Sequence, residues 1–223
     1  GASNTAAIAY GGSEANPSQT GKTESWDGSS WTEVNDLNTA RRYLAGTPGS
    51  PYTASLAFGG YPTGGSPNAQ TESWNGSSWT EVNDLNTSRG ILNGSGIQTA
   101  ALAFGGYTTT YVANTESWNG SSWTEVNDMS RPNGRGSMQG VGTTTASLAA
   151  GGSPPISALT EDWNGSSWSE TTDLPTGVSS AGGIGSSTSA FIANGRQGPS
   201  SAISVNAYEW DSTSNTTKTI STD

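Results

Sequence analysis

The sequence contains neither cysteine nor histidine. Without thiolates and imidazoles it forms no disulfides, holds no zinc site of the usual Cys or His type, and builds no Ser-His-Asp or Cys-His nucleophile system. Basic residues are also scarce, because 8 Lys and Arg stand against 18 Asp and Glu and give a formal net charge of −10. Since nucleic-acid binding depends on clustered basic side chains, we expect no nucleic-acid partner. We expect no cofactor, no bound metal and no catalytic residue.

Long hydrophobic runs are absent as well. No apolar run approaches the roughly 20 residues that a membrane-spanning helix needs, so we expect no membrane insertion. The start, "GASNTAAIAY", lacks the basic residues of a signal peptide. Hydrophobic residues make up only 30% of the chain, but nine Trp, seven Tyr and three Phe are present. Regularly placed aromatic side chains each bury a large area and can supply the core that the scarce aliphatic residues cannot.

Two short motifs recur five times along the chain. One is an apolar stretch closed by glycine, as in "ASLAFGG" at 54–60 and "AALAFGG" at 100–106. The other contains a tryptophan, as in "TESWNGSSWTEV" at 71–82, and a second tryptophan follows five residues later in every copy but the fifth. The first tryptophans of the five copies are Trp26, Trp74, Trp118, Trp163 and Trp210. A period of about 46 residues indicates a repeat architecture.

Each unit shows strand signals and no helix periodicity. In the second unit the expected strands lie in "RYLAGTPG" (42–49), "TASLAFGG" (53–60), "AQTESW" (69–74) and "SSWTEVN" (77–83). The "NGSS" between the last two is a strong hairpin signal, because Asn-Gly readily adopts positive φ. Four antiparallel strands repeated five times predict an all-β, five-bladed β-propeller of four-stranded blades. A β-sandwich is the main alternative, but it does not require five near-identical units.

We therefore expect a single domain over residues 1–223. Its repeat units run approximately over 1–40, 41–88, 89–134, 135–177 and 178–223. Residue 1 aligns with Gly49, so the first unit lacks its inner strand, and the chain supplies nineteen blade strands. The incomplete blade is expected to be the one that carries Trp26. A different strand order would instead leave the gap at the outer edge of the last blade.

The repeat unit resembles the kelch repeat. In both, an apolar strand ends in Gly-Gly and is followed by an aromatic residue and then a tryptophan, and the resemblance covers the whole chain. The double glycine stands at Gly11-Gly12, Gly59-Gly60, Gly105-Gly106 and Gly151-Gly152, with Asn194-Gly195 in the fifth unit. The resemblance implies that the Gly-Gly strand is second in its blade. The near-identity of the copies is similar to kelch-like proteins of tailed phages, which implies a virion-associated or tail location; the sequence itself leaves the location open. Kelch-related copper-radical oxidases need Cys and His, so that activity is excluded.

Acidic residues recur at fixed repeat positions and carry the enzymatic alternative. They are Glu33, Glu81, Glu125 and Glu170, and Asp36, Asp84, Asp128 and Asp173. Two of these carboxylates could form a glycoside hydrolase pair. Groups repeated in four blades more often stabilise every blade than catalyse once, so we favour the structural interpretation.

Variation between the copies is confined to two kinds of link, the one after Gly-Gly and the one after the fourth strand. In an up-and-down blade both lie on the same face of the disc, and we predict that this face binds a ligand. Arginine and tyrosine are favoured at recognition surfaces. The candidate ligand-binding residues are Arg42, Tyr61, Arg89, Tyr107, Tyr111, Arg135 and Arg196.

The sequence thus favours a non-enzymatic binding propeller that is monomeric as an isolated domain. Its expected partner is a glycan or a protein at a surface. A purely structural spacer module is the first alternative and a glycoside hydrolase is the second.

Overall fold

The computed structural model describes residues 5–15, 18–131, 134–197, 202–203, 206–213 and 216–220. All regular elements within these ranges are β-strands. No helix in the described part of the chain is long and apolar enough to cross a membrane.

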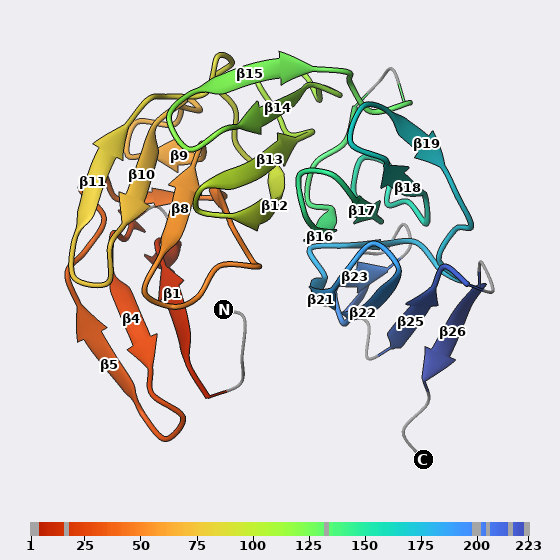
Figure 1. Cartoon of the computed structure of the whole chain (residues 1–223), viewed down its shortest axis with the longest axis horizontal. Helices are drawn as coiled ribbons and strands as arrows, with labels where there is room; N and C mark the ends of the chain where they lie inside the picture. Colours follow the sequence, from red (N-terminus) through yellow and green to blue (C-terminus); the bar gives the residue numbers. More distant parts are fainter. Residues whose placement is uncertain are drawn as a thin grey trace.

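The strands form a five-bladed β-propeller, as predicted (Figure 1). Blade 1 contains β1 (Ala7–Tyr10), β4 (Thr23–Trp26) and β5 (Trp31–Val34). Blade 2 contains β7 (Ala45–Gly46), β8 (Ser55–Phe58), β10 (Thr71–Trp74) and β11 (Trp79–Val82). Blade 3 contains β12 (Asn93–Ile97), β13 (Ala100–Phe104), β14 (Thr115–Trp118) and β15 (Trp123–Val126). Blade 4 contains β16 (Gln139–Gly142), β17 (Ser147–Ala150), β18 (Thr160–Trp163) and β19 (Trp168–Glu170). Blade 5 contains β21 (Gly182–Gly185), β22 (Ser189–Ala193), β25 (Ala207–Asp211) and β26 (Thr216–Ile220).

Each blade is an antiparallel meander that runs from the centre of the ring outwards. Blade 1 has three strands in the order β1-β4-β5, whereas the other four blades have four strands each. The prediction of nineteen blade strands, with the incomplete blade carrying Trp26, is therefore confirmed for the described residues. The last described strand, β26, pairs with β25 inside blade 5.

Short pairings join the two kinds of variable link. The strand β6 (Arg41–Arg42) pairs with β9 (Tyr61–Pro62), and β20 (Val178–Ser179) pairs with β23 (Arg196–Gln197). β23 also pairs with β24 (Ala202–Ile203), and β2 (Ser13–Ala15) pairs with β3 (Ser18–Gln19). Isolated bridges, Gly90 with Tyr107 and Gly136 with Ser153, make the same connection in the blades between. Both kinds of link therefore lie on one face, as the repeat pattern predicts.

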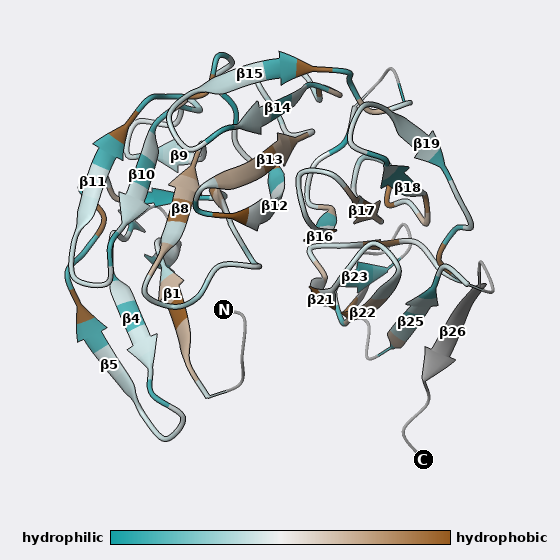
Figure 2. Ribbon diagram, in the orientation of Figure 1, coloured by the Kyte–Doolittle hydropathy of each residue, from teal (hydrophilic) through white to brown (hydrophobic). Residues whose placement is uncertain are grey.

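The core lies between neighbouring blades. Trp118 and Trp123 of blade 3 pack with Leu56 and Phe58 of β8, in the second blade. The Trp123 indole Nε1 also donates a hydrogen bond of 3.0 Å to Thr71 Oγ1. The strands β8 and β13, each second in its blade, are composed mainly of hydrophobic residues (Figure 2). Blades 2, 3 and 4 thus bury their tryptophan pairs against the blade before them.

Buried ion pairs secure three of the four junctions between blades. They are Arg41–Glu72 at 3.2 Å, Arg89–Glu116 at 3.1 Å and Arg135–Glu161 at 3.7 Å. The arginines also donate to backbone carbonyls, as Arg89 does to the Asn114 oxygen at 2.6 Å. At the fourth junction an apolar pair, Val178 and Tyr208, occupies the corresponding positions in one buried cluster.

The first glycine of each Gly-Gly pair is required by both backbone angle and space. Gly105 has a φ of +61°, and a methyl group there would overlap the Arg135 carbonyl oxygen and the Met138 methyl group. We expect Gly105→Ala to lower the free energy of unfolding by at least about 1–2 kcal/mol, the usual cost of the left-handed region for a non-glycine residue. Gly182→Ala is the control, since nothing lies within 4 Å of its added Cβ. Urea unfolding of both variants measures the difference, and equal midpoints would contradict it.

Candidate binding face

The variable face is the face where Arg42 pairs with Tyr61, Gly90 with Tyr107, Gly136 with Ser153 and Ser179 with Arg196. The opposite face carries the short hairpins within the blades, including the conserved Asn-Gly turns. Because loop variation is confined to the variable face, it is the candidate site for ligand binding.

A row of four tyrosines crosses the variable face from blade 2 to blade 3. We name Tyr43, Tyr61, Tyr107 and Tyr111 the tyrosine row. The rings of Tyr43 and Tyr61 meet edge to face with centroids 6.2 Å apart, and those of Tyr107 and Tyr111 do so at 5.0 Å. Tyr43 is 56% exposed, and the other three are half-buried.

Glycine brings the two halves of the row together. Gly90 pairs with Tyr107, and a methyl group on Gly90 would overlap the ring of Tyr61. Tyr61 therefore lies directly over a backbone that has no side chain, beside Tyr107. At the far end, a Cβ on Gly136 would lie 3.1 Å from Tyr111 Cε1. The tyrosine rings fit against the neighbouring links because Gly90 and Gly136 have no side chains at these positions.

A cation lies at one end of the row, and burial affects the hydroxyls of Tyr61 and Tyr111. The Arg42 guanidinium lies 5.2 Å from the centroid of the Tyr43 ring, within cation–π range. Burial raises the pKa of Tyr61, the neighbouring Tyr107 and Tyr111 raise it further, and Arg42 opposes them. Burial also raises the pKa of Tyr111. Both hydroxyls stay protonated at neutral pH and can donate as well as accept hydrogen bonds.

The row begins at the mouth of the central channel. Tyr43, Ile91, Ser137 and Ser180 occupy one repeat position, and each has a φ between +53° and +59°. The backbone N–H groups of Ile91, Ser137 and Ser180 each donate to the carbonyl of the preceding member, at 2.9, 2.9 and 2.8 Å. This hydrogen-bonded arc borders a cavity of about 190 Å³. A positive φ is unusual for a β-branched residue such as Ile91, and backbone strain of this kind concentrates at functional sites.

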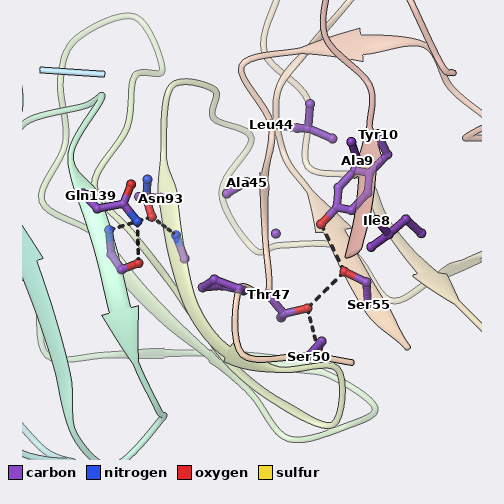
Figure 3. A pocket seen from close by; sticks show the side chains of 14 residues that line it. Ile8, Ala9, Tyr10, Leu44, Ala45, Thr47, Ser50, Ser55, Asn93 and Gln139 are labelled. Carbon is purple, nitrogen blue, oxygen red and sulfur yellow. Dashed lines mark hydrogen bonds between the residues drawn. The ribbon is translucent and has the colours of Figure 1, made fainter. Parts of the chain in front are cut away.

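A second cavity, of about 430 Å³, lies deeper in the channel beside β1 (Figure 3). Tyr10 bridges from β1 to blade 2, since its hydroxyl donates to the Leu56 carbonyl at 2.9 Å and lies 3.1 Å from Ser55 Oγ. Among the described residues that line this cavity, Tyr10 is the only titratable one, and burial raises its pKa. That described lining contains no carboxylate pair for acid–base chemistry.

The recurring aspartates have a structural role in every blade that carries them. A carboxylate oxygen of Asp36, Asp84, Asp128 and Asp173 accepts the backbone N–H of the residue that begins the third strand, at 3.1–3.2 Å. Each aspartate thus fastens the end of one strand to the start of another. Among the described residues, no group of three or more acidic side chains is arranged to hold a metal ion.

The structure brings four of the seven candidate residues together. Tyr61, Tyr107 and Tyr111 form the row, and Arg42 lies at its end. Arg196 is exposed on β23 in blade 5, away from the row.

The expectation that Arg89 and Arg135 present a binding surface is wrong. Both are buried and pair with Glu116 and Glu161. Their repeat position is that of Arg41, which points into the junction, and not that of Arg42. These arginines cannot reach a ligand because each lies inside a blade junction, where a carboxylate and backbone carbonyls accept its hydrogen bonds.

Sequence reasoning missed Tyr43, the most exposed member of the row. It lies just before the inner strand of blade 2 and was assigned to that strand. Its repeat position carries Ile91, Ser137 and Ser180 in the other blades, and this variation was a signal that the position faces solvent.

No family model matches this chain, and a comparison with curated proteins found no match.

Proposed function

We propose that this protein is a non-enzymatic binding module that recognises a glycan through the tyrosine row on its variable face. The tyrosine row is the observation that carries the proposal. Sugars stack their apolar faces on aromatic rings, and four neighbouring tyrosines offer ring edges, faces and hydroxyls on one surface. Arg42 at the end of the row favours a sugar that carries a carboxylate or sulfate there.

The resemblance to kelch repeats of tailed phages supports the same role. A virion or tail component that contacts a cell surface would present such a face outwards.

Glycan-array binding tests the proposal with variants that the chain itself suggests. Tyr43→Ser copies Ser137 and Ser180, which hold the same backbone angle, and Tyr111→Ala removes the other end of the row. We expect the double variant to bind the best glycan at least about tenfold more weakly, a loss of about 1.4 kcal/mol.

Tyr52→Ala is the matched control. Tyr52 is 43% exposed and lies in the hairpin between β7 and β8, on the opposite face. It should bind as tightly as the parent. If no glycan binds, or if the double variant binds like the parent while its fold is intact, the proposal fails. Capture of a protein ligand by the same tyrosines would instead make the partner a protein.

A further inference from the structure

The ring of blades is open between blade 1 and blade 5. In Figure 1 the sheet β1-β4-β5 and the sheet ending in β26 border a gap between the first and the last described blade. The repeats provide an internal standard for the faces along this gap, because each has counterparts that another blade covers.

On the face of blade 1 toward the gap, side chains are exposed whose counterparts in other blades are buried. Trp31 is 50% exposed, whereas its counterparts Trp79, Trp123 and Trp168 are buried. Each counterpart donates its indole N–H to a threonine of the preceding blade at 3.0 Å. Ala9 is also exposed, whereas its counterpart Ala57 is completely buried.

The same face carries a carboxylate without the partners of its counterparts. Glu24 is exposed, whereas Glu72 and Glu116 are buried and pair with Arg41 and Arg89. The link that supplies each arginine adds further contacts. Asn86, in that link, donates both its backbone N–H and its side-chain N–H to Glu116, at 2.7 and 2.9 Å. Glu24 and Trp31 therefore specify a neighbour with a Leu-Asn-Thr-x-Arg link after its outer strand.

Blade 5 offers an apolar surface on the other side of the gap. Phe191 is 40% exposed, although its counterparts Leu56, Leu102 and Leu148 are buried against the next blade. Ile184 pairs with Phe191 and is 63% exposed, whereas its counterpart Val141 is buried. Two apolar side chains thus lie where the other blades receive the aromatic pair of their neighbour.

We propose that the gap is a docking site for one further blade, a four-stranded sheet of this same repeat that carries the Leu-Asn-Thr-x-Arg link. Its aromatic pair covers Phe191 and Ile184. Its link covers Trp31 and places an arginine and an asparagine on Glu24. Two arguments support this occupant. The exposed residues on both sides of the gap occupy the positions that neighbouring blades cover at the observed junctions, and the Glu24 carboxylate complements the arginine in charge.

The chain contains a suitable blade for the test. A copy of residues 35–90 contains blade 2 and both flanking links, including Asn86 and Arg89. It is added directly after Ile220, whose place beside Ala207 matches that of Val82 beside Thr71. The readout is the shift in urea midpoint that Trp31→Ala causes in the 223-residue chain and in the extended protein.

We expect Trp31→Ala to leave the midpoint of the 223-residue chain unchanged and to lower that of the extended protein as much as Trp123→Ala does. In a control extension, Arg89→Ala and Asn86→Ala within the copy should remove much of this new sensitivity. A folded extended protein in which Trp31→Ala remains silent overturns the proposal.

A second measurement uses the 223-residue chain alone and does not depend on the folding of the extension. Hydroxyl-radical footprinting should oxidise Trp31 and Phe191 far more than Trp123 and Leu102, while sedimentation shows a monomer. Concentration-dependent protection of Trp31 together with dimer formation would make the occupant a second copy of this chain and would also overturn the proposal.

Discussion

Trp123→Ala is expected to lower the free energy of unfolding by about 3–5 kcal/mol, whereas Trp31→Ala should lower it by less than about 1 kcal/mol. The two tryptophans occupy the same repeat position and have nearly identical neighbours in sequence. Trp123 is buried between blades 2 and 3, packs on Phe58 with ring centroids 4.9 Å apart, and donates to Thr71 Oγ1. Trp31 faces the open side of the ring and is half exposed.

Urea unfolding followed by far-UV circular dichroism measures both losses. The parent and both variants should share one m-value, which shows that the unfolded state is unchanged. Equal losses at the two positions would contradict the assignment of the core to the junctions between blades.

Arg89→Met is expected to lower the free energy of unfolding by about 3–5 kcal/mol, because it leaves the buried Glu116 carboxylate without its cation. Replacing both partners of a junction should cost far less. At the next junction the double variant Arg135→Val/Glu161→Tyr copies Val178 and Tyr208, the apolar pair that the fourth junction already uses. We expect this double variant to fall within about 1 kcal/mol of the parent, since apolar replacement of a buried ion pair is often neutral.

The double variant also changes how stability depends on pH. Burial raises the pKa of Glu161 above its ordinary value of 4.5, and Arg135 only partly opposes this. A raised folded pKa gives stability that is fully present below 4.5 and is lost as the pH rises through the folded value. Chemical unfolding between pH 4 and 7 should therefore show a smaller decline in the double variant than in the parent. An unchanged decline would mean that Glu161 titrates normally.

The blades and their order could be predicted because each unit repeats the same local signals. The apolar strand closed by Gly-Gly and the Asn-Gly or Asp-Gly hairpin identify the strands in the first four copies, and the fifth copy keeps the apolar strand and its tryptophan. These are short-range features, and they do not depend on how neighbouring blades meet.

The junctions were harder to predict because adjacent residues point in opposite directions. Arg41 enters the core, whereas Arg42 lies on the variable face, and composition alone does not separate them. Counting from the preceding leucine would have helped, since Arg41 follows Leu37 at the same distance as Arg89 follows Leu85. The link to blade 4 has a different length, so Arg135 could not be placed by counting.

Exposure of Trp31 could not be predicted from its motif, which matches that of the buried tryptophans. Burial depends on the neighbouring blade, and the repeat pattern describes each blade separately. The tyrosine row could not be predicted for a similar reason. Its members come from three links, and the pairing of Gly90 with Tyr107 brings Tyr61 beside Tyr107.

Nuclear magnetic resonance of the seven tyrosine rings tests the central claim most directly. The protein is labelled with ¹³C-tyrosine and titrated with the best glycan from the array. The proposed function predicts shifts for the rings of Tyr43, Tyr61, Tyr107 and Tyr111, with no change at Tyr52 or at the buried Tyr208. Shifts at Tyr52, or a bound glycan that leaves the tyrosine row unchanged, would contradict it.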